Sequence, residues 1–99
     1  MKIIKKYVDM IEEEIESAKE YAENFVECKA KGDMQSATRY KEMANDELKH
    51  ANYIHEWAVK EIDEISKVYT APVEMVEKWE KAHKEYVEKV AWIKQMLAM

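Results

Sequence analysis

The sequence predicts an all-α protein, an antiparallel bundle of three long helices in a single domain over residues 1–99. Two features of the composition support this prediction. The chain has one glycine and one proline, and the helix formers Glu, Lys, Ala and Met are abundant. The third observation is the length of 99 residues, which suits one hydrophobic core. Because glycine and proline interrupt helices, their positions divide the chain into three helical segments, and we expect no strands.

The first helix is expected over residues 2–31. Its apolar residues recur at intervals of three and four, the spacing of one helix face. They are Ile4, Val8, Ile11, Ile15, Ala18, Ala22 and Phe25. Lys29 and Lys31 precede Gly32, and cations followed by glycine are typical of a helix C-terminus. Asp33 can cap the next helix, so a tight hairpin is predicted at this point.

The second helix is expected over residues 34–68 and the third over residues 72–97. The inward positions of the second are Ala37, Tyr40, Ala44, Leu48, Ala51, Ile54, Ala58, Ile62 and Ile65. Those of the third are Val76, Trp79, Tyr86, Val90, Ile93 and Leu97. Pro72 is tolerated in a first helical turn, and Thr70 ahead of it is a candidate cap. Such short connections predict antiparallel packing of neighbouring helices.

The charge pattern limits the classes of partner. The net charge is −5 with Lys and Glu finely interleaved, so no basic stripe exists and we expect no nucleic-acid binding. The longest uncharged run, residues 68–73, is far shorter than the roughly 20 residues of a membrane span, and residues 1–6 lack the apolar region of a signal peptide. We therefore expect a cytoplasmic protein without a membrane partner. Cys28 is the single cysteine, and its helical spacing from Phe25 and Tyr21 indicates packing.

Three ionisable side chains interrupt the apolar faces of the first two helices. Glu14 lies in the first helix, and Glu47 and His50 form a Glu-x-x-His motif in the second. A carboxylate and an imidazole three residues apart share a helix face, about 5–6 Å apart at the β-carbons, which suits two ligands of one metal ion. Glu14 lies 18 residues before Gly32 and His50 lies 18 after it, so antiparallel packing brings them to one level. Because burying an unpaired carboxylate is costly, their coincidence predicts a metal site.

His55, Glu80 and His83 are secondary candidates for metal ligands. His83 interrupts the apolar face of the third helix at nearly the depth of His55, and Glu80 precedes it by three residues but leaves the best apolar face. An inward histidine is more often a hydrogen-bonded core residue. A glutamate at the edge of an apolar face is more often paired with lysine in solvent, an alternative that also applies to Glu14 and Glu47 taken singly.

These residues resemble the metal-binding helices of the ferritin-like superfamily, in particular of its rubrerythrin-type members. In that family a Glu is followed seven residues later by Tyr on the first helix, and Glu-x-x-His is followed by a small residue on the second. Here Tyr21 follows Glu14 by seven residues, and Ala51 follows the Glu-x-x-His motif. The resemblance covers about residues 14–57. Small chains encoded by phages and prophages are similar in length and in a second histidine five residues on, here His55.

The resemblance implies a four-helix bundle that holds two metal ions and is built from two such helix pairs. This chain has one clear pair, so the resemblance implies either a homodimer or higher homo-oligomer in which each copy gives Glu14, Glu47 and His50, or an incomplete site. It further implies iron, or manganese, with Glu47 bridging and with Fe(II) oxidation or peroxide handling as the reaction. The alternative is a structural or partner-binding helical module whose site is vestigial and binds no metal.

Overall fold

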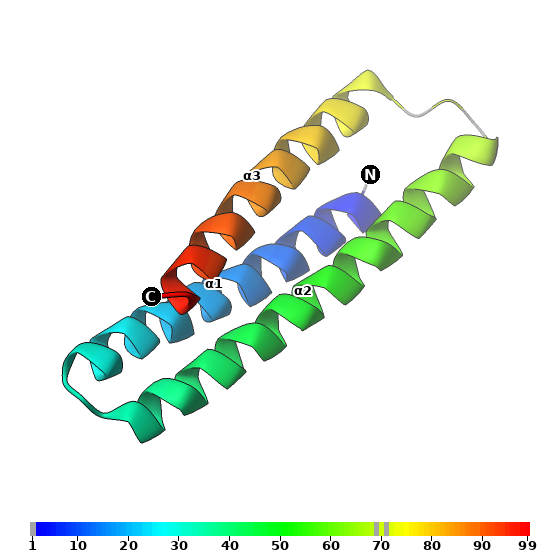
Figure 1. Cartoon of the computed structure of the whole chain (residues 1–99). Helices are drawn as coiled ribbons and strands as arrows, with labels where there is room; N and C mark the ends of the chain where they lie inside the picture. Colours follow the sequence, from blue (N-terminus) through cyan, green and yellow to red (C-terminus); the bar gives the residue numbers. More distant parts are fainter. Residues whose placement is uncertain (1, 69, 71) are drawn as a thin grey trace.

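The computed structural model describes residues 2–68, 70 and 72–99, and over these residues the chain forms three α-helices and no strand. Helix α1 comprises Lys2–Ala30, α2 Met34–Val68 and α3 Val73–Leu97. The predicted all-α class and the order of three long helices are confirmed. Helices α1 and α2 form an antiparallel hairpin, and α3 returns beside α1 in the same direction as α1 (Figure 1).

The turn between α1 and α2 has the features predicted for it. Gly32 adopts a φ of 81°, in the left-handed region that glycine occupies without strain. The amide of Asp33 donates to the carbonyl of Cys28 at 2.9 Å and that of Gly32 to Lys29 at 3.1 Å, which is the Schellman pattern of a helix C-terminus. The carboxylate of Asp33 in turn accepts a hydrogen bond of 3.1 Å from the backbone N–H of Ser36 and caps α2.

The start of α3 differs by one residue from the prediction. The N-cap is Pro72, with no side-chain capping bond, so the helix begins at Val73 and Thr70 is not its cap. The carbonyl of Pro72 accepts the first helical bonds, from the amides of Met75 at 3.0 Å and Val76 at 3.2 Å. Residues 69 and 71 of the predicted connection lie outside the described residues.

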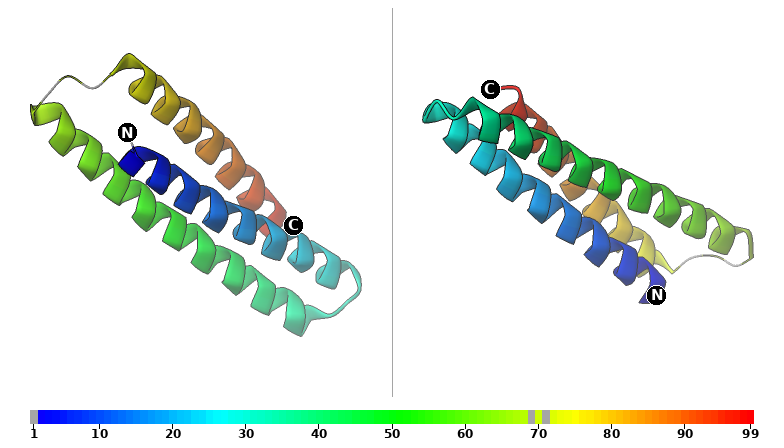
Figure 2. Two further views of the ribbon diagram at one scale, coloured as in Figure 1. Left: turned by 180° about the vertical axis from the view of Figure 1, so that it is seen from behind. Right: turned by 90° about the horizontal axis from the view of Figure 1, so that it is seen from below.

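Helix α1 is the common packing partner of the other two helices. It contacts α2 most extensively and α3 less so, whereas contacts between α2 and α3 are few. Figure 2 shows the same arrangement from two further sides. The buried core residues that pack together are Ile11, Ile15, Ala18, Ala22, Phe25, Ala37, Ala44, Leu48, Ala51, Ile54, Ile93 and Leu97. Cys28 is partly buried at the edge of this core, which agrees with the predicted packing role.

The molecule is a narrow rod with principal extents of 55 × 18 × 17 Å. Charged side chains cover much of its surface, in ion pairs such as Lys5 with Asp9 and Lys31 with Glu27. None of the helices described is apolar over a length that would cross a membrane.

The turn gives a first testable prediction. We expect Gly32→Ala to lower the free energy of unfolding by about 1–2 kcal/mol, because a Cβ disfavours a φ of 81° while nothing lies within 4 Å to clash with it. Urea denaturation followed by circular dichroism measures the change. Gly32→Asn should cost less because Asn adopts left-handed dihedrals more readily, and the exposed Gln35→Ala serves as control. Equal stability of Gly32→Ala and the parent protein would contradict this account of the turn.

Candidate metal centre

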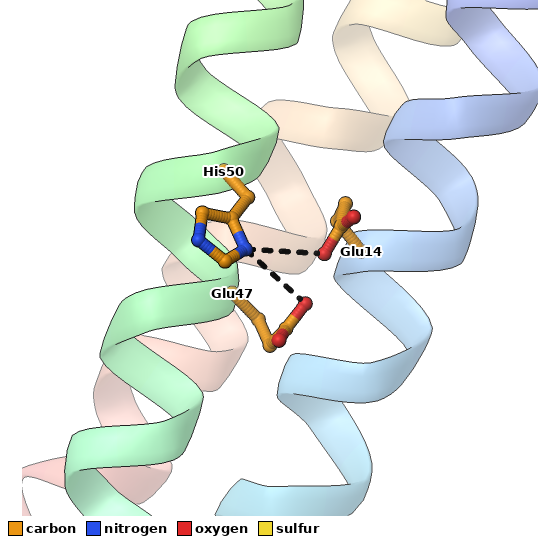
Figure 3. A group of neighbouring side chains, drawn as sticks. All are labelled: Glu14, Glu47 and His50. Carbon is orange, nitrogen blue, oxygen red and sulfur yellow. Dashed lines mark ion pairs between the residues drawn. The ribbon is translucent and has the colours of Figure 1, made fainter.

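Three polar side chains from two helices converge near the middle of the rod. Glu14 extends from α1, and Glu47 and His50 extend from neighbouring turns of α2 toward it (Figure 3). In this view α3 lies behind the α1–α2 pair, so the three side chains lie on the side of the hairpin that α3 leaves uncovered. We call this side of the α1–α2 hairpin, which carries Glu14, Glu47 and His50, the open face.

The distances within the cluster suit a shared cation. Nδ1 of His50 lies 3.7 Å from Oε2 of Glu14 and 3.8 Å from Oε2 of Glu47, both too long for a good hydrogen bond. One potential ligand atom from each of the three residues lies within 4.8 Å of the others. Ligand atoms about 2.1 Å from a metal ion are separated from one another by roughly 3–4 Å. The predicted convergence of Glu14, Glu47 and His50 is therefore observed.

The electrostatics of the cluster show an excess of negative charge. A hydrogen bond with Glu47 is the main cause that raises the pKa of Glu14, and partial burial and the charge of Glu47 add to it. His50 acts in the opposite direction on the same carboxyl. The two glutamate side chains are 29% and 23% exposed, so water screens their repulsion only in part. A bound cation would relieve this repulsion.

The open face is apolar on both sides of the cluster. Helical spacing places Met43 and Trp57 on the same face of α2 as Glu47 and His50, and their side chains are 41% and 57% exposed. On one side of the cluster the rings of Tyr21 and Tyr40 stack with centroids 6.3 Å apart.

The secondary candidates do not join this cluster. Within residues 2–68, 70 and 72–99, the only group of three or more His, Cys, Asp or Glu with ligand atoms so close together is Glu14, Glu47 and His50. Glu80 is exposed on α3. His55 and His83 lie against each other with ring centroids 5.0 Å apart, but the described part of the chain brings no third ligand to them.

The stacking of His55 was not predicted. Its ring lies parallel to that of Tyr86, at an interplanar angle of 6° and 5.2 Å between centroids, and also stacks on Trp79. The available signal was the spacing of Trp79, His83 and Tyr86 along one face of α3. It identified an apolar face, but not which residue of α2 the face would meet.

Comparisons with models of known protein families, with curated proteins and with solved structures each found no significant match to this chain. The ferritin-like resemblance therefore stays a prediction that rests on the motifs and on the geometry above. The donor set itself fits iron and manganese, because two carboxylates and one imidazole are ligand types that both metals accept.

A second prediction concerns the metal-free protein. Because the pKa of Glu14 is raised in the folded state, the folded chain holds more protons than the unfolded chain just above the ordinary glutamate range, and stability falls as pH rises through that window. We therefore expect Glu14→Gln to be at least as stable as the parent protein at neutral pH, with a weaker loss of stability as pH rises above the ordinary glutamate pKa of about 4.3. Urea denaturation in the presence of chelator measures both effects.

The matched control is Glu13→Gln, which removes the same charge from an exposed neighbouring position. If Glu14→Gln were less stable than Glu13→Gln at neutral pH, the carboxylates would not repel each other as described.

Proposed function

We propose that this protein is a ferritin-like metal-binding protein whose centre, of the di-iron carboxylate type, forms where two copies meet. Each copy contributes Glu14, Glu47 and His50. The observation that carries the proposal is the approach of one ligand atom from each of these residues to within 4.8 Å of the others. Carboxylates from two helices and an imidazole three residues after one of them match the donor pattern of such bundles.

Both helices would supply metal ligands, Glu14 from α1 and Glu47 and His50 from α2. Glu47 lies beside both other ligands, with Glu14 as a hydrogen-bond partner and Nδ1 of His50 3.8 Å from its Oε2, so it would be the ligand shared between two ions. Nδ1 of His50 is directed toward the carboxylates and would be its ligand atom, which would leave the ring proton on Nε2. Bound iron would supply the redox chemistry, either oxidation of Fe(II) by oxygen or the handling of peroxide. A cation held by these carboxylates would compete with the proton that the raised pKa of Glu14 favours.

A second copy is proposed because three ligands from one chain leave a di-iron site incomplete. The open face carries exposed apolar side chains on the same surface as the ligands, including Trp57 and Met43. Aromatic residues stand seven residues before and after Glu14, at Tyr7 and Tyr21, and the same spacing from His50 leads to Trp57. A face with its ligands in the middle and aromatic residues on both sides suits pairing with itself across a two-fold axis.

The exposed Trp57 and Met43 also favour a second candidate, a helical module that binds a partner through the open face and holds no metal. The two functions differ in one requirement. Only the metal-binding protein needs the imidazole of His50 and the carboxylates of Glu14 and Glu47.

Titration with metal separates these functions and gives the third prediction. Anaerobic addition of Fe(II) or Mn(II) should saturate at about one ion per chain, since two copies would hold two ions. His50→Ala and Glu47→Gln should abolish binding, measured by calorimetry and by metal analysis after gel filtration. The control is His83→Ala, which disrupts the second Glu-x-x-His motif of the chain and should leave the stoichiometry unchanged. Absence of binding by the parent protein would leave the helical module as the function.

Association provides the fourth prediction. In the presence of Mn(II) the sedimentation mass should be twice that of the chain, and Trp57→Glu should remain monomeric because a charge replaces an apolar contact of the open face. Trp92→Glu is a closely matched control, since Trp92 on α3 is also 57% exposed but lies at the groove between α1 and α3. If both variants dimerise like the parent protein, the open face is not the contact between copies.

A further inference from the structure

Four rings form a cluster that connects α2 to α3, and we call it the histidine cluster: His55 from α2, and Trp79, His83 and Tyr86 from α3. The ring centroid of His55 lies 5.0–5.6 Å from each of the other three. Because α2 and α3 otherwise make few contacts, these stacked rings form much of the interface between the two helices.

The imidazole of His55 is poorly placed to carry a positive charge. Its Nε2 is buried, and no described group of the protein lies within hydrogen-bonding distance of it. The adjoining cavity of ≈ 20 Å³ accommodates about one water molecule, which is too little to solvate an imidazolium ion. A proton added at Nε2 would therefore leave a charged donor without a partner, a costly arrangement in a protein interior.

The charged groups around His55 come from all three helices. Glu12 of α1, Glu85 and Lys89 of α3 and His83 line the same cavity, and Glu56 is its neighbour on α2. Burial is the main cause that lowers the pKa of His55, the charge of His83 lowers it further, and Glu56 acts in the opposite direction. The neutral ring is thus the form that fits the stack at neutral pH.

The packing of α3 is uneven along its length. Near its C-terminus Ile93 and Leu97 are buried, and the Lys29 ammonium of α1 donates a hydrogen bond to the carbonyl of Met99. Over residues 73–86, Met75 is buried, Trp79, Ala82 and Tyr86 are partly buried, and His83 is exposed at the edge of the stack. Loss of the stack would therefore free the N-terminal half of α3 while the C-terminal half stays on α1.

We propose that the histidine cluster is a proton-sensitive contact, in which the neutral ring of His55 holds the N-terminal half of α3 against α2 and its protonation from solvent releases it. A histidine whose folded form resists protonation stabilises the structure above the ordinary histidine pKa of about 6.5, and this contribution is lost as pH falls below that value. Acidification would expose the faces of α1 and α2 that residues 73–86 cover.

Amide hydrogen exchange of the full chain, with peptides resolved by mass spectrometry, tests the proposal. After correction for the intrinsic pH dependence of exchange, opening of residues 73–86 should increase severalfold between about pH 7.5 and 5.5. Exchange over residues 90–97 should change much less. Equal opening of residues 73–86 at both pH values would overturn the proposal.

Variants assign the effect to the cluster. His55→Phe keeps a ring in the stack but cannot take up a proton, and His55→Gln is polar but also stays uncharged; both should lose the pH response of residues 73–86. His83→Gln should reduce the response, because a positive charge at position 83 can then no longer oppose protonation of His55. His50→Gln is the matched control and should retain the full response, since His50 faces Glu14 and Glu47. A response that persists in His55→Phe and His55→Gln would also overturn the proposal.

Discussion

The close contact between α1 and α2 is the constraint on which the rest of the structure depends. Fully buried alanines lie in this contact, Ala18 and Ala22 on α1 and Ala44 and Ala51 on α2, each with no exposed surface. Small side chains let two helix backbones approach closely, and the tight turn at Gly32 sets which residues lie opposite one another. The same contact brings side chains of moderate length, such as Glu14 and His50, within reach across the hairpin.

The level of each residue along the helix axis could be predicted from the sequence, because it depends only on the number of residues from the turn. Each helical residue advances 1.5 Å, so equal counts on either side of Gly32 placed Glu14 level with His50. What could not be predicted is where α3 would lie around α1. That position depends on side-chain packing, and it decides that Trp57 is exposed and that His55 meets Tyr86.

The glutamates of the cluster differ from others on the same helices. Glu23 and Glu27 are exposed and pair with lysines four residues away, an arrangement that contributes little to stability. Glu14 and Glu47 instead lie half-buried beside each other, with the imidazole of His50 next to both. Two carboxylates that repel each other lower the stability of the fold. Such a pair beside an imidazole and within reach of solvent is typical of functional sites more than of structural ones. Among the described residues, the ion-pair partner of both glutamates is His50 and not a lysine.

His50 and His55 show how one helix can place the same residue type in opposite surroundings. Five residues turn the direction of a side chain by about 140° around the helix axis. His50 therefore reaches the open face, where its Nδ1 lies 3.7 Å and 3.8 Å from the carboxylates of Glu14 and Glu47. His55 faces α3, where a second imidazole and three aromatic or apolar neighbours favour the neutral ring. The residue type alone thus indicates nothing about role; the face of α2 on which each histidine lies decides it.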